Sequence, residues 1–520
     1  MNSSNPFKNF KSDIPASIVV FFVALPLCLG IALASGAPPI SGLIAGIIGG
    51  IIVGIISGSH IGVSGPAAGL AAIVFAAIES LGFRDFLVAV VLAGVIQILF
   101  GVLRLGIIGY FFPSSVIRGM LTGIGIIIIL KEIPYFFGYD PVKGEGTFAA
   151  IGSTFSNISV GATVVGLIGI AILLLWQNVL TKKAKIFQLI QGPLVAVIIG
   201  ILFYVFLGDS ETFGIAAESL VEVPVPETMD SFLNQFVFPN WAVIAKPEVL
   251  ITAFTIALVA SLETLLCVEA TDKIDPLKRV TPTNRELIAQ GAGNVVSGLI
   301  GGLPITQVIV RSSANIQSGG RTKMSAIVHG FFLLISIILI PTLLNKIPLA
   351  VLAAILFIVG YKLAKPAAFK SMWDAGWMQF VPFIVTVLLI VFKDLLWGIG
   401  IGLAIGVIIT LFKSYQNSHF LHIEDKSNGK HRIKMTLAEE VTFFNKATIL
   451  KELDSLPKDT HLELDVRKTS YLDHDVIEIL DDFKEKAKNR NINVKLVSER
   501  GTVENPESYI EFFKLRPTQS

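Results

Sequence analysis

Residues 304–322 read PITQVIVRSSANIQSGGRT, and residues 60–69 read HIGVSGPAAG. Each stretch combines glycine and proline with an apolar segment that is too short for a full membrane span. We expect two partial spans, at 63–79 and 307–319, each preceded by extended chain. Irregular backbone inside a membrane is tolerated only where it is buried in protein or lines a cavity. The two segments therefore indicate the functional centre of an otherwise apolar fold.

The rest of the chain has the composition of a membrane protein. Of its 520 residues, 53% are hydrophobic and only 15% are charged, whereas a soluble chain carries about 25% charged residues. Mean hydropathy is +0.73. This composition excludes a disordered, collagen-like or disulfide-stapled protein, and the net charge of +2 is too small to indicate nucleic-acid binding. Cys28 and Cys267 lie in apolar runs, which indicates small core residues and not redox groups.

Apolar runs define a transmembrane region at 15–413, after a cytoplasmic N-terminal tail at 1–14. A full span needs roughly 17 to 25 residues. The expected full spans are 15–35, 39–57, 86–105, 114–131, 158–178, 190–208, 248–270, 285–301, 323–343, 348–364, 378–393 and 395–413. With the two partial spans they make about 14 transmembrane elements of an α-helical polytopic membrane protein.

The charges in the loops predict the topology. Lysine and arginine are concentrated in alternate connections, whereas the long 209–245 loop is acidic. Because basic loops remain on the cytoplasmic side, we expect both termini in the cytoplasm and the chain in the cell (inner) membrane. The basic loop residues are Lys182, Lys183, Lys185, Lys273, Lys278, Arg279, Arg285, Arg321, Lys323, Lys362, Lys365 and Lys370.

The membrane region repeats itself. One constant shift aligns Leu-Ile-Ala at 43–45 with Leu-Ile-Ala at 287–289 and brings several glycines into register. The matched glycines are Gly49 with Gly293, Gly54 with Gly298 and Gly58 with Gly302. The shift covers about seven spans, and because seven is odd the two copies must be oppositely oriented. This predicts a 7+7 inverted repeat, in which interrupted segments at matching positions form a transporter's binding site.

The character of the sequence changes after Ser414, where charged residues become frequent. We expect a linker at 414–431 and a small cytoplasmic α/β domain with a C-terminal tail at 432–520. Strand-like runs at 432–437, 461–466 and 493–497 alternate with helix-like runs at 446–456 and 475–487. The residues expected to form its core are Val441, Phe443, Phe444, Ile449, Leu453, Leu462, Leu464, Val466, Ile477, Ile479, Leu480 and Phe483.

The first partial span has the features of a helix that starts inside the membrane. Pro66 suits the first helical turn, and Ser64 or Gly65 can precede it as the N-cap. Such a helix directs free backbone N–H groups and the positive end of its dipole toward the centre. Anions are the natural ligands of that arrangement. The alternative is a Gly/Pro kink that serves packing only.

The second partial span carries a cation. Under the repeat, Arg311 falls opposite Ala67, near the start of its helix. A charge in the hydrocarbon region is costly unless it is paired or hydrated. Arg311 therefore either adds to an anion site or is a structural residue paired with a carboxylate, for which Glu263 is the candidate. Glu263 itself is expected to couple a proton or cation, or to act as a counter-charge; His329 is interpreted as a packing residue.

These segments resemble the sulfate permease (SulP) family of inorganic anion transporters. The resemblance lies in ALPLCLGIA at 24–32, in Val63–Pro66, in Glu263 and in the stretch 304–322. It implies seven plus seven inverted helices in core and gate domains, with an anion held between the third and tenth elements. The implied substrate-binding residues are Leu27, Ile31, Ser64, Gly65, Pro66, Ala67, Ala68, Ile309, Val310, Arg311 and Ser312, and the implied coupling residues are Glu263 and Cys267.

The C-terminal segment resembles the cytoplasmic STAS domain of that family, at 441–445, 464–466 and 471–474. Related anti-sigma-factor antagonists carry a phosphorylatable serine where this chain has His474, so regulation of that kind is not expected. Family members are typically dimers, which implies a homodimer. The cyanobacterial sodium–bicarbonate members have Asp in place of Glu263 and threonine in place of Cys267, and they lack Arg311. The chain therefore looks less like a sodium site and more like the arginine-bearing branch.

The sequence holds no Walker-type phosphate loop, no His/Cys cluster at metal spacing and no nucleophile elbow. We therefore expect no enzyme, and no cofactor beyond a coupling ion, either a proton or sodium. The leading hypothesis is a secondary transporter that moves an inorganic oxyanion, sulfate or bicarbonate, by alternating access. A passive anion channel, an anion exchanger, and a membrane sensor that signals through the C-terminal domain are the alternatives.

Overall fold

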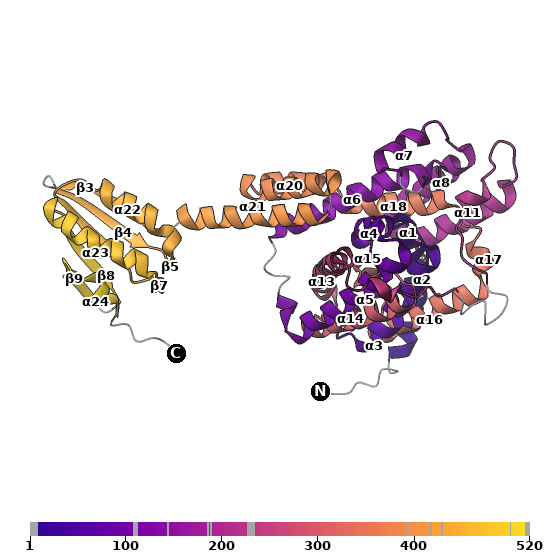
Figure 1. The fold of residues 1–520 in the computed structure, drawn as a ribbon, viewed down its shortest axis with the longest axis horizontal. Coiled ribbons are helices and arrows are strands. Elements are labelled where there is room, and N and C mark those ends of the chain that lie inside the picture. Colours follow the sequence, from indigo (N-terminus) through magenta and orange to yellow (C-terminus); the bar gives the residue numbers. More distant parts are fainter. Residues whose placement is uncertain are drawn as a thin grey trace. The chain divides into compact units, whose positions relative to one another are not determined.

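The computed structural model describes residues 9–107, 113–142, 145–184, 187, 190–225, 235–393, 395–416, 419–427, 430–499 and 501–514. The chain divides into two compact units, Met1–Leu403 and Ala404–Ser520. The first unit is helical and the second contains a sheet, as Figure 1 shows.

Every transmembrane element expected from the sequence has its helix in the structure. They are α1 (Phe10–Ala34), α2 with α3 (Pro39–Ile48 and Gly54–Ile56), α4 (Ala71–Leu81), α5 (Phe83–Val102), α6 (Ser114–Phe136), α8 (Val160–Leu175), α11 (Gly192–Leu207), α13 (Pro247–Ile274), α14 (Thr283–Leu299), α15 (Ile309–Gln317), α16 (Met324–Leu339), α18 (Leu349–Leu363), α20 (Trp377–Phe392) and α21 (Leu395–Gln416). Shorter helices α7 (Thr147–Thr154), α9 (Thr181–Lys183), α17 (Pro341–Leu344) and α19 (Pro366–Asp374) connect them. Helix α1 begins at Phe10, inside the expected N-terminal tail.

Length and apolarity fit these helices to a bilayer. Among the described residues, six helices are long and apolar enough to cross a membrane: Phe10–Ala34, Pro39–Ile56, Phe83–Val102, Val160–Lys183, Pro247–Ile274 and Leu349–Asp374. Large apolar side chains on outer faces are left uncovered, including Phe206 and Phe392, which are 78% and 72% exposed. Lipid is the solvent that such faces require.

The helices of the first unit pack in two groups. In one group α5 packs along α14 and α13, and α1 packs along α16 and α2; in the other α6 packs along α18 and α20, and α8 packs along α18 and α11 (Figure 1). Facing glycines allow the helix backbones to approach closely within each group. In the first group, a Cβ atom on Gly94 would lie only 2.6 Å from the carbonyl oxygen of Gly291. In the second, a Cβ atom on Gly125 would lie 2.6 Å from the carbonyl oxygen of Gly360. We call these sets the core group and the gate group.

Two short strands cross at the middle of the core group. Strand β1 (Ser64–Pro66) pairs antiparallel with β2 (Ile305–Gln307), with Ser64 opposite Gln307 and Pro66 opposite Ile305. The N–H of Val308 also donates to the carbonyl oxygen of Val63, at 3.0 Å. In the inverted repeat, Ser64 is equivalent to Val308, and Val63 is equivalent to Gln307. The bond between Val308 and Val63 is therefore related by the repeat's symmetry to the pairing of Ser64 with Gln307. The expected inverted repeat is confirmed, and extended chain does precede each partial helix.

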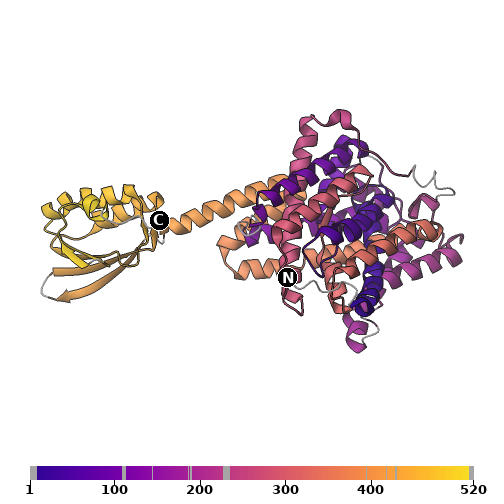
Figure 2. The same ribbon diagram turned by 90° about the horizontal axis from the view of Figure 1, so that it is seen from below.

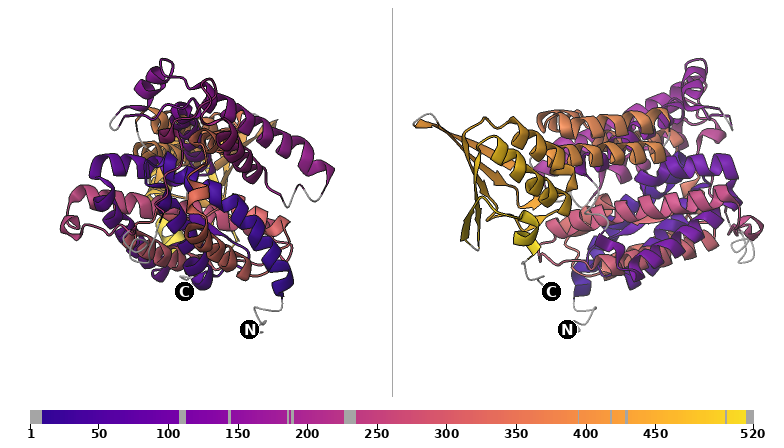
Figure 3. Two further views of the ribbon diagram at one scale, coloured as in Figure 1. Left: turned by 90° about the vertical axis from the view of Figure 1, so that its right-hand side faces the viewer. Right: turned by 60° about the vertical axis from the view of Figure 1, so that its left-hand side comes forward.

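The second unit is an α/β domain with one main sheet. Its strands β3 (His419–Ser427), β4 (Lys430–Leu437), β6 (Thr460–Asp465), β8 (Asn493–Ser498) and β9 (Gly501–Glu504) are ordered β3-β4-β6-β8-β9. The three central strands are parallel, and helices α22 (Lys446–Ser455) and α23 (His474–Asn489) connect them on one face (Figures 2 and 3). The small pair β5 (Glu440–Val441) and β7 (Tyr471–Leu472) and helix α24 (Tyr509–Lys514) complete the domain.

Two expectations about this unit need correction. The segment expected as a linker, 414–431, contains β3, which pairs with β4 through residues such as Leu421 and Met435. The alternation of polar and apolar residues in this segment is short, and many of its residues are charged. For that reason the sequence did not predict a strand there. Phe443 and Phe444 are 50% and 42% exposed and pack against each other with tilted rings whose centroids are 4.1 Å apart, so they do not belong to the core.

Candidate functional site

The β1–β2 pair fixes where both partial helices begin. After β1 the chain makes one 3₁₀ turn, Ala68–Leu70, before α4 starts at Ala71. The helix was expected to begin at Pro66, but Pro66 lies within β1, because pairing with β2 holds it extended. Helix α15 starts directly after Val308. The starts of the two partial helices therefore lie on either side of one central strand pair.

Arg311, in the first turn of α15, brings a positive charge to this centre. It is 1% exposed, and its Nη2 donates to the Sγ of Cys28, at 3.3 Å. Its Nε and Nη1 have no partner in the described part of the chain. A Cβ atom on Gly65 would collide with Nη1, so glycine is required there for the guanidinium to lie against β1. A guanidinium carries five N–H donors, and most of these are unused.

Glu263 approaches the same centre from α13 but does not pair with Arg311. Its carboxylate accepts the N–H of Gly69, and its buried Oε2 has no partner among the described residues. A Cβ atom on Gly69 would lie 2.6 Å from both carboxylate oxygens. One turn further along α13, the Sγ of Cys267 accepts the N–H of Ile309. The two residues expected to couple transport thus each meet the start of one partial helix.

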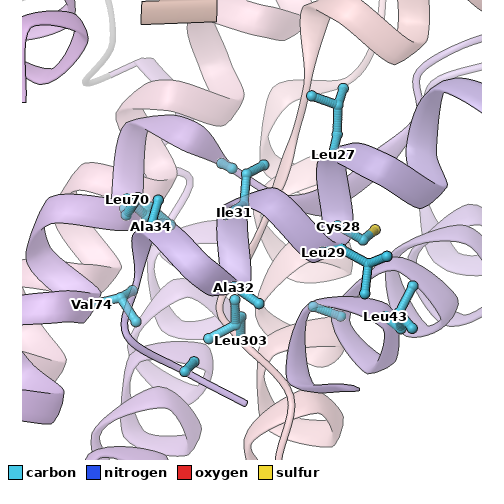
Figure 4. Close-up of a cluster of buried hydrophobic side chains, with 14 of the residues drawn as sticks. Leu27, Cys28, Leu29, Ile31, Ala32, Ala34, Leu43, Leu70, Val74 and Leu303 are labelled. Atoms are coloured by element: carbon cyan, nitrogen blue, oxygen red, sulfur yellow. The ribbon is translucent and has the colours of Figure 1, made fainter. Parts of the chain in front are cut away.

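Helix α1 contributes a wall to the site. Leu27 and Ile31 are buried and lie four residues apart on the same side of α1, as Figure 4 shows. Cys28 lies beside them and is the residue that contacts Arg311. A Cβ atom on Gly46 of α2 would lie 2.6 Å from the Sγ of Cys28. Cys28 was expected to be a packing residue only, and an apolar run gives no signal for a contact with a distant arginine.

The remaining expected site residues differ in what they can do. Ser312 accepts the N–H of Val63, at 3.0 Å, and donates to the carbonyl oxygen of Val308, at 2.8 Å, so its hydroxyl is occupied in holding the strand pair. Ala67 is buried, whereas Val310 is 44% exposed and points away from the centre of the unit. Ala68 and Ile309 are half-buried at the starts of their helices.

A row of polar residues on α14, which the sequence reasoning missed, supports Ser64. The amide nitrogen of Gln290 donates to the Oγ of Ser64, at 2.7 Å, and to Oε1 of Glu286, at 2.8 Å. Because the Glu286 carboxylate is an acceptor, the NH₂ group of Gln290 must face it, and its second hydrogen reaches Ser64. The Oγ of Ser64 is therefore an acceptor in this bond, and its own O–H is available to a ligand.

Glu286 is buried and Glu263 is half-buried, and their carboxylates have different surroundings. Glu286 accepts the Oγ–H of Ser57, at 2.5 Å, the Gln290 amide, and the N–H groups of Gly58 and Ser59. Glu263 accepts from Gly69 and keeps an oxygen free. A carboxylate with all its positions filled holds a loop in place, whereas one with a free oxygen can take up a proton or a cation.

Asn294 extends the α14 row to the second strand. It donates to Oε1 of Gln97, at 2.6 Å, and accepts the N–H of Ile305, at 2.5 Å. These polar residues are spaced four apart, which places Glu286, Gln290 and Asn294 on one face of α14. Polar residues at this spacing in an apolar segment could have predicted the row from the sequence. Among the described residues, no group of three or more His, Cys, Asp or Glu side chains could hold a metal ion.

Comparisons with known proteins identify the family. A model described as the Sulfate permease family matches residues 10–386, most of the chain. The chain belongs to the sulfate permease family. Similar members include the "Putative sulfate transporter YvdB" of Bacillus subtilis, 28% identical over 94% of this chain and 92% of that one. The "Bicarbonate transporter BicA" of Picosynechococcus is 28% identical over 84% of this chain and 76% of that one.

A solved structure agrees with the fold of this sulfate permease family member. The structure of SLC26A9 has a TM-score of 0.76 over 94% of this chain and 84% of that chain, at 17% identity. At that identity the likeness concerns the fold alone, and it extends into the C-terminal α/β unit. The relatives are transporters and not enzymes, in agreement with the expectation from the sequence.

Proposed function

We propose that the chain is a secondary transporter that moves an inorganic oxyanion, sulfate or bicarbonate, across the membrane. The observation that carries the proposal is the buried guanidinium of Arg311, which has unused N–H donors and no carboxylate partner among the described residues. An isolated buried charge costs several kcal/mol, and an anion that entered the site would remove that cost. The start of α15, the hydroxyl of Ser64 and the backbone beside Gly65 add further positive potential at the same place.

The proposal includes alternating access between the two packing groups. The core group holds β1, β2, Arg311 and Glu263, and helices α18 and α11 of the gate group pack against α1 of the core group. Rocking of one rigid group against the other would open the site to each side in turn. Glu263, with its free oxygen, is the proposed coupling residue. We also propose that both termini are cytoplasmic, that the protein lies in the cell membrane, and that it forms a homodimer.

Reconstitution into liposomes tests the proposal. Uptake of labelled sulfate, bicarbonate and chloride would be compared under imposed proton and sodium gradients, with Arg311→Ala as the site control. Accumulation above the external concentration under one of these gradients is expected. Flux that only runs down the anion's own gradient would identify a channel instead. Normal uptake by protein lacking residues 417–520 would exclude the sensor hypothesis.

A further inference from the structure

Helices of the core and gate groups line a cleft away from the β1–β2 pair. It has a volume of about 400 Å³ and is lined by α4 and the first turns of α13 on the core side, and by α6, α7 and the end of α20 on the gate side. Gly36, in the turn between α1 and α2, lies against the Phe75 ring of α4. The cleft is therefore on the face where α1 ends, opposite the N-terminus. With a cytoplasmic N-terminus, this is the outer face.

Lys131 is the distinctive residue of this cleft. Its Nζ lies 3.1 Å from the centroid of the Phe75 ring, which makes a cation–π contact between the gate group and the core group. Lys393 also lines the cleft, together with hydroxyl groups of Ser80 and Thr252, and its described lining contains no carboxylate. A lysine at membrane depth is costly and normally faces a cavity or a partner.

Two carboxylates lie near Lys131 without forming an ion pair with it. Glu79 is exposed on α4, and Glu132 is fully buried with both oxygens unpartnered among the described residues. Both act on Lys131 only through longer-range electrostatics, and neither lines the cleft. Among the described residues, no hydrogen-bond acceptor pairs with the ammonium group, and it lies beside a partly apolar cavity, where attraction for an anion is stronger than in bulk water.

We propose that this cleft is a second anion site, which takes a small oxyanion at the outer face before it reaches Arg311. The inference rests on the proposed function, since it gives the outer end of that pathway. Phosphate of an anionic lipid headgroup has the same chemistry as a free oxyanion, so the experiment must separate the two sources. In either case Lys131 in its ammonium form supplies the charge, and the Phe75 ring lies against the ammonium.

The first test measures protection of Lys131 in the full chain. Sealed vesicles of phosphatidylcholine would be treated with a membrane-impermeant amine-acylating reagent, and labelling would be read peptide by peptide by mass spectrometry. External sulfate is expected to slow labelling of Lys131 severalfold. Lys246, on the same face and with a side chain 57% exposed, is the matched control and should not change. Protection by phosphatidylglycerol without sulfate would identify the lipid headgroup as the occupant. Protection by neither, or no labelling of Lys131 beside labelled Lys246, overturns the proposal.

The second test uses transport. Lys131→Gln should lower sulfate uptake from a dilute external solution about tenfold, because focused charge raises local anion concentration by that order. The difference from the wild type should shrink at high salt, which screens the charge. Lys246→Gln should behave as the wild type. Equal uptake by Lys131→Gln and the wild type rejects the site. A wild type that carries no anion would reject the proposed function instead, and the labelling result would still decide on the cleft.

Discussion

Removal of the Arg311 charge is the most direct test of the site. The side chain is 1% exposed, donates to Cys28 and has two nitrogens without partners among the described residues. A bound oxyanion would accept charge-assisted hydrogen bonds from those nitrogens, and the loss of such a contact costs about 2 kcal/mol. That corresponds to about thirtyfold weaker binding. This estimate includes only one hydrogen bond to the anion. Arg311→Ala should therefore weaken sulfate binding by about thirtyfold or more.

The stability of the variant separates binding from folding. Since Arg311 has no carboxylate partner in the described part of the chain, its removal breaks no ion pair, and the loss of packing is offset by the loss of a buried unpaired cation. The unfolding temperature without anion should therefore change little. In the wild type, sulfate at about 100 times its Kd should stabilise the fold by about 2.7 kcal/mol. This anion-dependent increase should disappear in Arg311→Ala.

The assay is binding of labelled sulfate to purified protein together with thermal unfolding with and without sulfate. Arg311→Lys keeps the charge and should recover part of the affinity, although a single ammonium cannot replace the planar donor set. Arg321→Ala removes an exposed arginine outside the site and serves as the control. Unchanged sulfate affinity in a folded Arg311→Ala protein would refute the reasoning and leave Arg311 a structural residue.

Three further outcomes are expected. Glu263→Gln keeps the shape of the side chain but cannot exchange a proton, so gradient-driven accumulation should be lost while anion-for-anion exchange persists; intact accumulation would move coupling to another residue. Removal of residues 417–520 should reduce the dimer fraction in detergent more than anion binding per subunit, and equal cross-linking with and without the segment would exclude that role. In the C-terminal unit, hydrogen bonds from Arg467 hold the pKa of Asp465 well below its usual range, so this stabilisation is complete above the unfolded pKa of about 4 and is lost as the pH falls further. The unfolding temperature of residues 417–520 should therefore drop in acid, and Asp465→Asn should flatten that pH dependence.

The membrane fold could be predicted from the sequence because lipid imposes simple rules. Spans must be long and apolar, loops must carry their charge asymmetrically, and interruptions such as those near Pro66 and Pro304 are tolerated only at a protein-buried centre. The conformation at Pro66 was predicted wrongly because local propensity favours a helix start there. Pairing with β2, hundreds of residues away in the chain, holds it extended instead. Only tertiary structure decides that competition.

The site could be predicted in part. Arg311 and Glu263 were found because each is a charge in an apolar segment. That they do not pair with each other depends on Gly69, which gives Glu263 a backbone N–H, and on Gly65, which lets Arg311 lie against β1. No pattern in the sequence encodes such distances. The row Glu286, Gln290, Asn294 was visible in the sequence, but its link to Ser64 requires the fold that brings α14 beside β1.

The separation of Arg311 from Glu263 has a consequence for the movement of charge. Two opposite charges that are not paired with each other can be neutralised independently, Arg311 by the anion and Glu263 by a proton or cation. With both groups ionised, the empty site carries no net charge, and with a monovalent anion and one coupling cation it again carries none. With divalent sulfate and one cation it carries one negative charge, whose passage across the membrane is worth about 2.3 kcal/mol per 100 mV. We infer that the same geometry would move bicarbonate electroneutrally and sulfate against an inside-negative potential, so that electroneutral uptake of sulfate would require a second coupling cation.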